Sequence, residues 1–205
     1  MKNLIWNIVL AVFTPIFFFA AILPGRAKKY FIWGSAPLIN NKYWSNALRE
    51  YGFNSITLMQ YHFKINKRDD FDFYVDDFAP KFLPKVARMG LGTCLALIFA
   101  LRSAKVVHIS FNGFLLGNTL FWRLEPFLFR VAGVKVIIIP FGADVYMYSK
   151  LIDPSLRHGL LASYPKYSRL EDKVEKSAKY WVKRADIVIA GPMIDGVGRW
   201  DVTTN

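Results

Sequence analysis

The N-terminal segment is the feature that most restricts how this chain folds. The run LIWNIVLAVFTPIFFFAAIL, Leu4–Leu23, has no charged residue, and its strongly polar interruptions are Asn7 and Thr14. Twenty helical residues measure about 30 Å, which is the hydrocarbon thickness of a bilayer. The run therefore predicts a membrane anchor helix over residues 1–25, which either spans the bilayer or lies in its plane. A cleaved signal peptide and a buried core helix are the two alternatives.

Basic residues beside this run predict the side of the membrane on which the rest of the chain lies. Only Lys2 precedes the run, whereas Arg26, Lys28 and Lys29 follow it at once. Positively charged flanks stay in the cytoplasm, and basic residues are attracted to anionic headgroups. We therefore expect residues 26–205 to be membrane-associated, on the cytoplasmic face of the cell membrane.

The composition excludes several other classes of protein. Hydrophobic residues make up 54% of the chain and aromatic residues 17%, which excludes intrinsic disorder. Cys94 is the single cysteine, so no intrachain disulfide forms, and it shares no metal-ligand spacing with the three histidines. The net charge of +12 is compatible with nucleic-acid binding. No nucleic-acid motif is present, however, so we expect neither a metal nor a nucleic-acid partner.

Short apolar segments alternate with longer helical stretches in residues 26–205. Continuous β-branched runs are typical of strands buried on both faces, and alternation of such strands with helices favours a parallel sheet. We expect an α/β fold, with a Rossmann-like parallel sheet flanked by helices in one domain. The expected strands are Tyr30–Ser35, Ser55–Met59, Phe71–Val75, Val106–Phe111, Val134–Pro140 and Asp186–Ala190; the expected helices are Tyr43–Tyr51, Pro80–Ser103, Leu115–Ala132 and Tyr167–Arg184.

Candidate site residues lie where these strands end, because ligands bind at the carboxyl ends of parallel strands. Asp144 is a candidate general base or ligand of substrate hydroxyls. The alternatives are an ordinary turn at Gly34, a core histidine at His108 and a cap of the segment 146–151 at Asp144. The candidate residues are Gly34, Ser35, His108, Phe111, Asn112, Gly113, Phe141, Gly142 and Asp144.

An acidic segment resembles a metal-binding pattern of another transferase class. Asp70-Phe71-Asp72 has the D-x-D spacing that holds a divalent cation on nucleotide phosphates. It lies in a polar loop with further aspartates and does not follow a buried strand. We interpret it as a solvated acidic loop.

Three segments resemble the N-terminal domain of GT-B-fold glycosyltransferases, in the retaining nucleotide-sugar-dependent group called family 4-like or group 1. VVHISFNG, around His108, resembles that family's D-x-x-H-x-H strand. IIIPFGAD, which ends at Asp144, resembles its H-G-x-D strand, and KRADIVIA resembles its A-D-x-V-I-x-x-S strand. The resemblance covers residues 30–195. Phe141 replaces the family histidine, Pro192 stands near a common serine, and the Glu-x7-Glu motif of the second domain is missing.

The resemblance implies the acceptor-binding half of a glycosyltransferase, without the C-terminal donor-binding domain. Such an enzyme transfers sugar from a nucleotide sugar to a lipid-linked or polysaccharide acceptor, and this half alone is expected to be inactive. Asp144 would orient or deprotonate the acceptor hydroxyl beside Gly142, while Gly34 and Ser35 would meet the donor phosphates. No metal or cofactor is implied, since helix N-termini and basic side chains take the phosphate charge.

Two alternative functions fit the same residues. One is an anchored acceptor subunit of a two-component glycosyltransferase, which predicts an exposed apolar face. The other is a non-catalytic, membrane-anchored binding or scaffold domain, which Phe141 in place of histidine supports.

Overall fold

Residues 2–23, 28–190 and 195–203 are described by the computed structural model, so Arg26 and Pro192 lie outside the described residues. The chain divides into two units: unit 1 contains residues 1–108 and 113–136, and unit 2 contains residues 109–112 and 137–205. Seven strands form a parallel sheet in the order β3-β2-β1-β4-β5-β6-β7. The first six follow the strand order of doubly wound nucleotide-binding folds. The α/β prediction with a Rossmann-like sheet is thus confirmed.

Strand β1 (Tyr30–Ser35) is the central strand of unit 1. It pairs on one side with β2 (Ser55–Met59) and on the other with β4 (Ala104–Ile109), while β2 continues to β3 (Phe73–Tyr74). The predicted bounds of β1 and β2 are confirmed, and β4 ends two residues earlier than predicted. Because the chain winds outward from β1 to β3 and then returns to the other side of β1, the winding reverses between β1 and β4.

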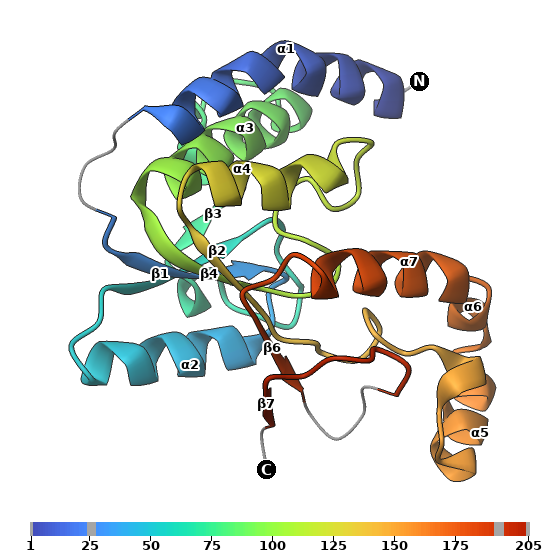
Figure 1. The fold of residues 1–205 in the computed structure, drawn as a ribbon. Helices are drawn as coiled ribbons and strands as arrows, with labels where there is room; N and C mark the ends of the chain where they lie inside the picture. Colours follow the sequence, from blue (N-terminus) through green and yellow to red (C-terminus); the bar gives the residue numbers. More distant parts are fainter. Residues whose placement is uncertain (1, 24–27, 191–194, 204–205) are drawn as a thin grey trace. The chain divides into compact units, whose positions relative to one another are not determined.

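Helices cover both faces of the sheet in unit 1. Figure 1 shows α2 (Ile39–Glu50) on one face and α3 (Lys85–Ser103) with α4 (Glu125–Val131) on the other. Helix α2 begins four residues before its predicted start and ends at Glu50, one residue before its predicted end, with Tyr51 as its C-cap and Gly52 following at a φ of +81°. Helix α3 begins at Lys85 and not at Pro80, because Pro84 occupies its N-cap position with an extended backbone.

Helix α1 (Lys2–Ile22) lies outside α3 and α4 and contacts both (Figure 1). Its residues Leu10 and Phe17 are completely buried. Among the described residues, α3 is the helix whose length and apolar composition are sufficient to cross a membrane. Its residues Cys94, Leu97 and Leu101 are buried in the protein, so α3 is a core helix in this fold.

The predicted helix Leu115–Ala132 is wrong over its first half. Only α4 and a preceding 3₁₀ turn, Trp122–Leu124, are helical there. The reason is Glu125, whose carboxylate accepts hydrogen bonds from the backbone N–H groups of Phe114, Leu115 and Leu116. These residues therefore form a loop around a side chain instead of a helical turn.

Unit 2 contains the remaining elements. Strand β5 (Lys135–Ile138) leads into it from unit 1, and β6 (Ile187–Ala190) and β7 (Val202–Thr203) follow. The predicted helix 167–184 is divided into α6 (Pro165–Ser168) and α7 (Glu171–Val182), while α5 (Pro154–Ser163) and β7 were not predicted. Asp153 is the N-cap of helix α5, and its carboxylate accepts hydrogen bonds from the N–H groups of Ser155 and Leu156.

The acidic loop of unit 1 is paired with basic and polar side chains. It contains the 3₁₀ turns Arg68–Asp70 and Val75–Phe78 on either side of β3. Asp70 accepts a hydrogen bond from Lys42 at 2.6 Å, and Asp72 binds Arg49 and the backbone N–H of Thr57. The two carboxylates of the D-x-D pattern thus have different partners, and no group of three metal-ligating side chains occurs among the described residues.

Candidate functional site

The carboxyl ends of β1 and β4 bring together four of the predicted site residues in unit 1. His108 and Trp33 are register partners on these neighbouring strands, and their rings stack with centroids 3.8 Å apart at an interplanar angle of 5°. The Trp33 indole donates a hydrogen bond to Ser55 Oγ at 3.0 Å. Gly34 and Ser35 follow Trp33 in β1, and Gly113 follows β4 after a short connection.

His108 is a buried, neutral imidazole. Only 8% of the residue is exposed, and Nδ1 has no hydrogen-bond partner among the described residues. Burial lowers the pKa of His108 to about 4, against the opposing effect of a backbone hydrogen bond with Ile32. The ring is therefore uncharged at neutral pH, so it fits a role in hydrogen bonding or packing better than one in charge attraction. Its predicted contact with substrate stays a prediction.

Gly34 is required by the packing of β1. A Cβ at this position would lie 2.6 Å from the carbonyl oxygen of Leu58 and 2.6 Å from the Phe114 ring. Ser35 is 9% exposed, and its carbonyl accepts the N–H of Gln60 at 2.8 Å. Gly34 lies inside β1, so the alternative of an ordinary turn there is wrong, and close packing explains the glycine. Contact of Gly34 and Ser35 with a donor phosphate stays a prediction.

Glu125 holds the loop that follows β4, and the sequence analysis missed it. The residue is completely buried, and the loop begins at Gly113, whose φ of +83° favours glycine. Burial raises the pKa of Glu125 to about 7, while its three backbone N–H donors act in the opposite direction. A glutamate directly before a proline at the start of a helix is the sequence signal that could have indicated it.

The raised pKa of Glu125 predicts a pH-dependent stability. Because the pKa of Glu125 is about 7 in the folded chain and 4.5 for an ordinary glutamate, protonation of this side chain stabilises the fold fully below pH 4.5, and the contribution is lost as the pH rises through 7. Relative to a Glu125→Gln variant, wild-type protein should lose about 2–3 kcal/mol of unfolding free energy between about pH 5 and 8.

Urea unfolding of both full-length proteins across this range measures the difference. Asp144 and His108 also titrate, but they do so in both proteins and cancel in the comparison. Parallel pH profiles would contradict the prediction.

Asp144 connects two strand ends within unit 2. It is 1% exposed, and its carboxylate accepts the N–H groups of Phe141 at 2.9 Å, Gly142 at 3.0 Å and Phe111 at 3.0 Å. Burial raises the pKa of Asp144 to about 6, against the effect of these hydrogen bonds. The alternative that Asp144 caps the segment 146–151 is wrong, because its oxygens bind residues that precede it. A role as general base stays a prediction; in this geometry the residue positions the loop 141–144.

The other predicted residues of unit 2 divide into buried and accessible ones. Phe111 is completely buried, and its carbonyl accepts a hydrogen bond from Ser177 at 2.6 Å, so its side chain belongs to the core and not to an open site. Asn112 is exposed. Phe141 is 39% exposed, and Gly142 has a φ of +122°.

Phe141 and Gly142 line a cavity of about 210 Å³ with residues that the sequence analysis did not identify. The rings of Tyr164 and Tyr167 meet edge to face at 6.2 Å, and the Tyr148 hydroxyl donates to the Tyr164 carbonyl at 3.2 Å. No Asp, Glu, Lys or Arg is among the described lining residues. These are Phe141, Gly142, Ala143, Tyr146, Tyr148, Leu160, Tyr164, Tyr167 and Val174.

The sequence signal for this cavity is two short tyrosine-rich segments, Tyr146–Tyr148 and Tyr164–Tyr167, separated by α5. Comparison of the chain with protein-family models, with curated protein sequences and with solved structures gives no match. The strand order and the two groups of residues described above are therefore the features of this chain that indicate a function.

Proposed function

We propose that this chain is the acceptor-side part of a membrane-associated glycosyltransferase. The transferred sugar comes from a nucleotide sugar, and the acceptor is a lipid-linked sugar or a polysaccharide. The observation that carries the proposal is the reversal of winding between β1 and β4 in unit 1. In open parallel sheets ligands bind outside the strand ends at such a point, and here those ends carry Gly34, Ser35 and His108.

The tyrosine-lined cavity of unit 2 supports acceptor binding. A sugar ring has an apolar face of C–H groups and a rim of hydroxyls, and tyrosine offers a matching apolar ring with a polar edge. Because no charged side chain lines the cavity, it favours a neutral sugar over a phosphate. Asp144 fixes one side of the cavity, because its carboxylate accepts hydrogen bonds from the backbone N–H groups of Phe141 and Gly142.

A transfer assay with the full-length chain in membranes tests the proposal. Radiolabelled nucleotide sugars are supplied with and without a co-expressed candidate donor-binding subunit. We expect label in the lipid fraction only when both chains are present, and a loss of about tenfold or more for Tyr167→Ala, since aromatic contacts dominate such sites. Tyr51→Ala, at a position 82% exposed in unit 1, is the matched control and should transfer normally.

A second candidate function, a non-catalytic sugar-binding domain, is favoured by the burial and the hydrogen bonding of Asp144. All three of its described hydrogen bonds join it to backbone N–H groups, and it is buried from solvent. Binding of neutral glycans to the purified chain, lost in Tyr167→Ala but without transfer under any condition, would favour this function over the enzyme.

A further inference from the structure

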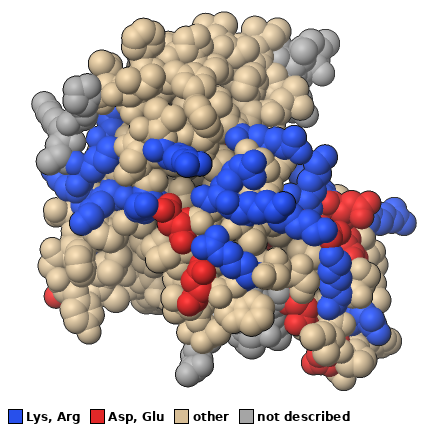
Figure 2. Space-filling model, in the orientation of Figure 1, with Lys and Arg blue, Asp and Glu red and all other residues tan. Residues whose placement is uncertain are grey.

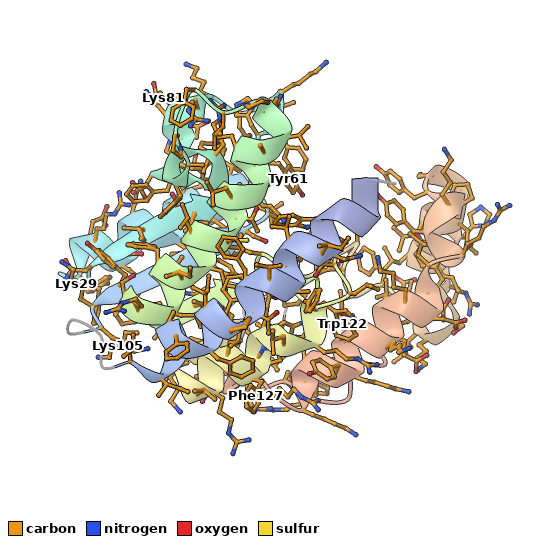
Figure 3. The ribbon with its side chains drawn as sticks, turned by 90° about the horizontal axis from the view of Figure 1, so that it is seen from above. Lys29, Tyr61, Lys81, Lys105, Trp122 and Phe127 are labelled. Atoms are coloured by element: carbon orange, nitrogen blue, oxygen red, sulfur yellow. The ribbon has the colours of Figure 1, made fainter. Side chains whose placement is uncertain are left out.

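Helix α1 is attached lengthwise to the body of unit 1. Besides the buried Leu10 and Phe17, its Phe18 ring meets Phe127 of α4 edge to face at 5.7 Å. On α3 the approach is so close that a Cβ at Gly90 would lie 3.0 Å from the Trp6 ring. Figure 3, seen from above, shows α1 lying over these two helices.

Lys28 fixes the chain just after α1 to the same two helices. Its ammonium donates to the carbonyl of Leu101 in α3 at 2.9 Å and to the carbonyl of Ala132, directly after α4. Burial lowers the pKa of Lys28. A positive charge at two helix C-termini is favourable, because unpaired carbonyls gather there. Both α1 and Lys28 are thus attached to the body of unit 1, which favours a helix that stays on this body over one that crosses a bilayer.

The opposite side of α1 is an exposed apolar stripe. Its residues recur every three or four positions along the helix and are 45–68% exposed. Phe127 of α4, 51% exposed, lies beside it (Figure 3). An exposed apolar patch of this kind marks an interaction surface. We call it the α1 apolar face; it consists of Ile8, Val12, Ile16, Phe19 and Ile22.

The charge around this face is predominantly positive. Within α1, α3 and α4 the single acidic residue is Glu125, which is buried. Figure 2 shows an uncharged surface over α1 with Lys and Arg along its border. In Figure 3, Lys29 and Lys105 lie beside the C-terminal end of α1, whereas Lys81 lies away from this helix. The exposed basic residues of these helices and the segments next to them are Lys29, Lys81, Lys85, Lys105, Arg123 and Arg130.

We propose that the α1 apolar face docks on the surface of a bilayer that contains anionic lipids, with α1 in the plane of the interface. The apolar side chains enter the boundary between headgroups and acyl chains, and the basic border binds the headgroups. The proposal specifies the membrane association included in the proposed function, but it does not depend on sugar transfer.

Vesicle binding tests the partner. The full-length chain is mixed with vesicles of phosphatidylcholine alone or with added phosphatidylglycerol, and the bound fraction is measured. We expect tighter binding to the anionic vesicles, weakened by salt, and a loss of roughly tenfold or more for Val12→Asp and Phe19→Asp. Ile65→Asp adds the same charge at a site 90% exposed on unit 1 and should bind like wild type.

Depth measurement tests the orientation. Nitroxide labels on Ile8→Cys and Phe19→Cys, about 16 Å apart along the helix, should report similar shallow depths for an in-plane helix. Cys94 is completely buried, so the label attaches to the introduced thiol. Depths that differ by most of that spacing would mean a spanning helix. Equal binding of Phe19→Asp and wild type, or self-association without vesicle binding, would overturn the docking surface. Failure of the transfer assay leaves these readouts unchanged.

Discussion

Replacing Glu125 by alanine should lower the free energy of unfolding at pH 6 by about 3–5 kcal/mol. With a pKa of about 7, Glu125 is mostly protonated at pH 6, and its two carboxyl oxygens accept hydrogen bonds from the backbone N–H groups of Phe114, Leu115 and Leu116 in a completely buried site. Alanine would leave these donors without an acceptor, and each buried unpaired donor costs about 1–3 kcal/mol. Water that enters the new cavity can replace part of the lost bonding.

Urea unfolding of the full-length variant measures the effect, and hydrogen exchange localises it. The amides of residues 114–116 should lose protection first, because they lose their hydrogen-bond acceptor. Glu50→Ala, at an exposed position at the end of α2, is the control and should change stability by no more than about 0.5 kcal/mol. A similarly small effect at Glu125 would show that the loop after β4 does not depend on the carboxylate.

The second large effect is expected for Gly92→Ala, in the middle of α3. A Cβ there would lie 2.0 Å from the carbonyl oxygen of Val75 and 2.8 Å from its carbonyl carbon. These are backbone atoms, so no side-chain rotation relieves the clash, and the 3₁₀ turn Val75–Phe78 has to move away from α3. We expect the free energy of unfolding to fall by about 3 kcal/mol, which is at the upper end of the range for overpacked sites. The better helix propensity of alanine recovers only about 1 kcal/mol.

Gly159→Ala in α5 is the matched control, because it is also a glycine inside a helix. No atom lies within 4 Å of a Cβ at that position, so the substitution should be neutral or stabilising by up to about 1 kcal/mol. Thermal unfolding of the two variants side by side measures the difference. Equal melting temperatures would show that α3 and the 3₁₀ turn are not packed as described.

The sheet was more predictable from sequence than the loops around it. The segments YFIWGS and SITLM contain β-branched and aromatic residues bounded by turn residues, and their predicted bounds are the bounds of β1 and β2. The prediction of a helix at 115–132 was wrong over its first half. The apolar periodicity of this segment could not show that the Glu125 side chain binds the backbone ten residues before it. A side chain that bonds the backbone across such a distance leaves no local pattern.

The candidate site was predicted in part for a similar reason. His108 and Gly34 were identified because ligands bind at strand ends, and register pairing does place their strands side by side. Burial is a property of the folded neighbourhood, so the sequence could not show that Asp144 and Phe111 are enclosed. The tyrosines of the cavity come from two segments joined only by the fold of α5.

The attachment of α1 to α3 and α4 has a consequence for biosynthesis. A ribosome completes α1 first, but the helices that bind it are complete only after Val131. At about 5–20 residues per second, this interval lasts on the order of 5–20 s. During that time Leu10 and Phe17 are as exposed as Val12 and Phe19, and the whole circumference of the helix is open to chaperones and lipid. The residues of α1 can therefore contact chaperones and lipid several seconds before they can contact α3 and α4.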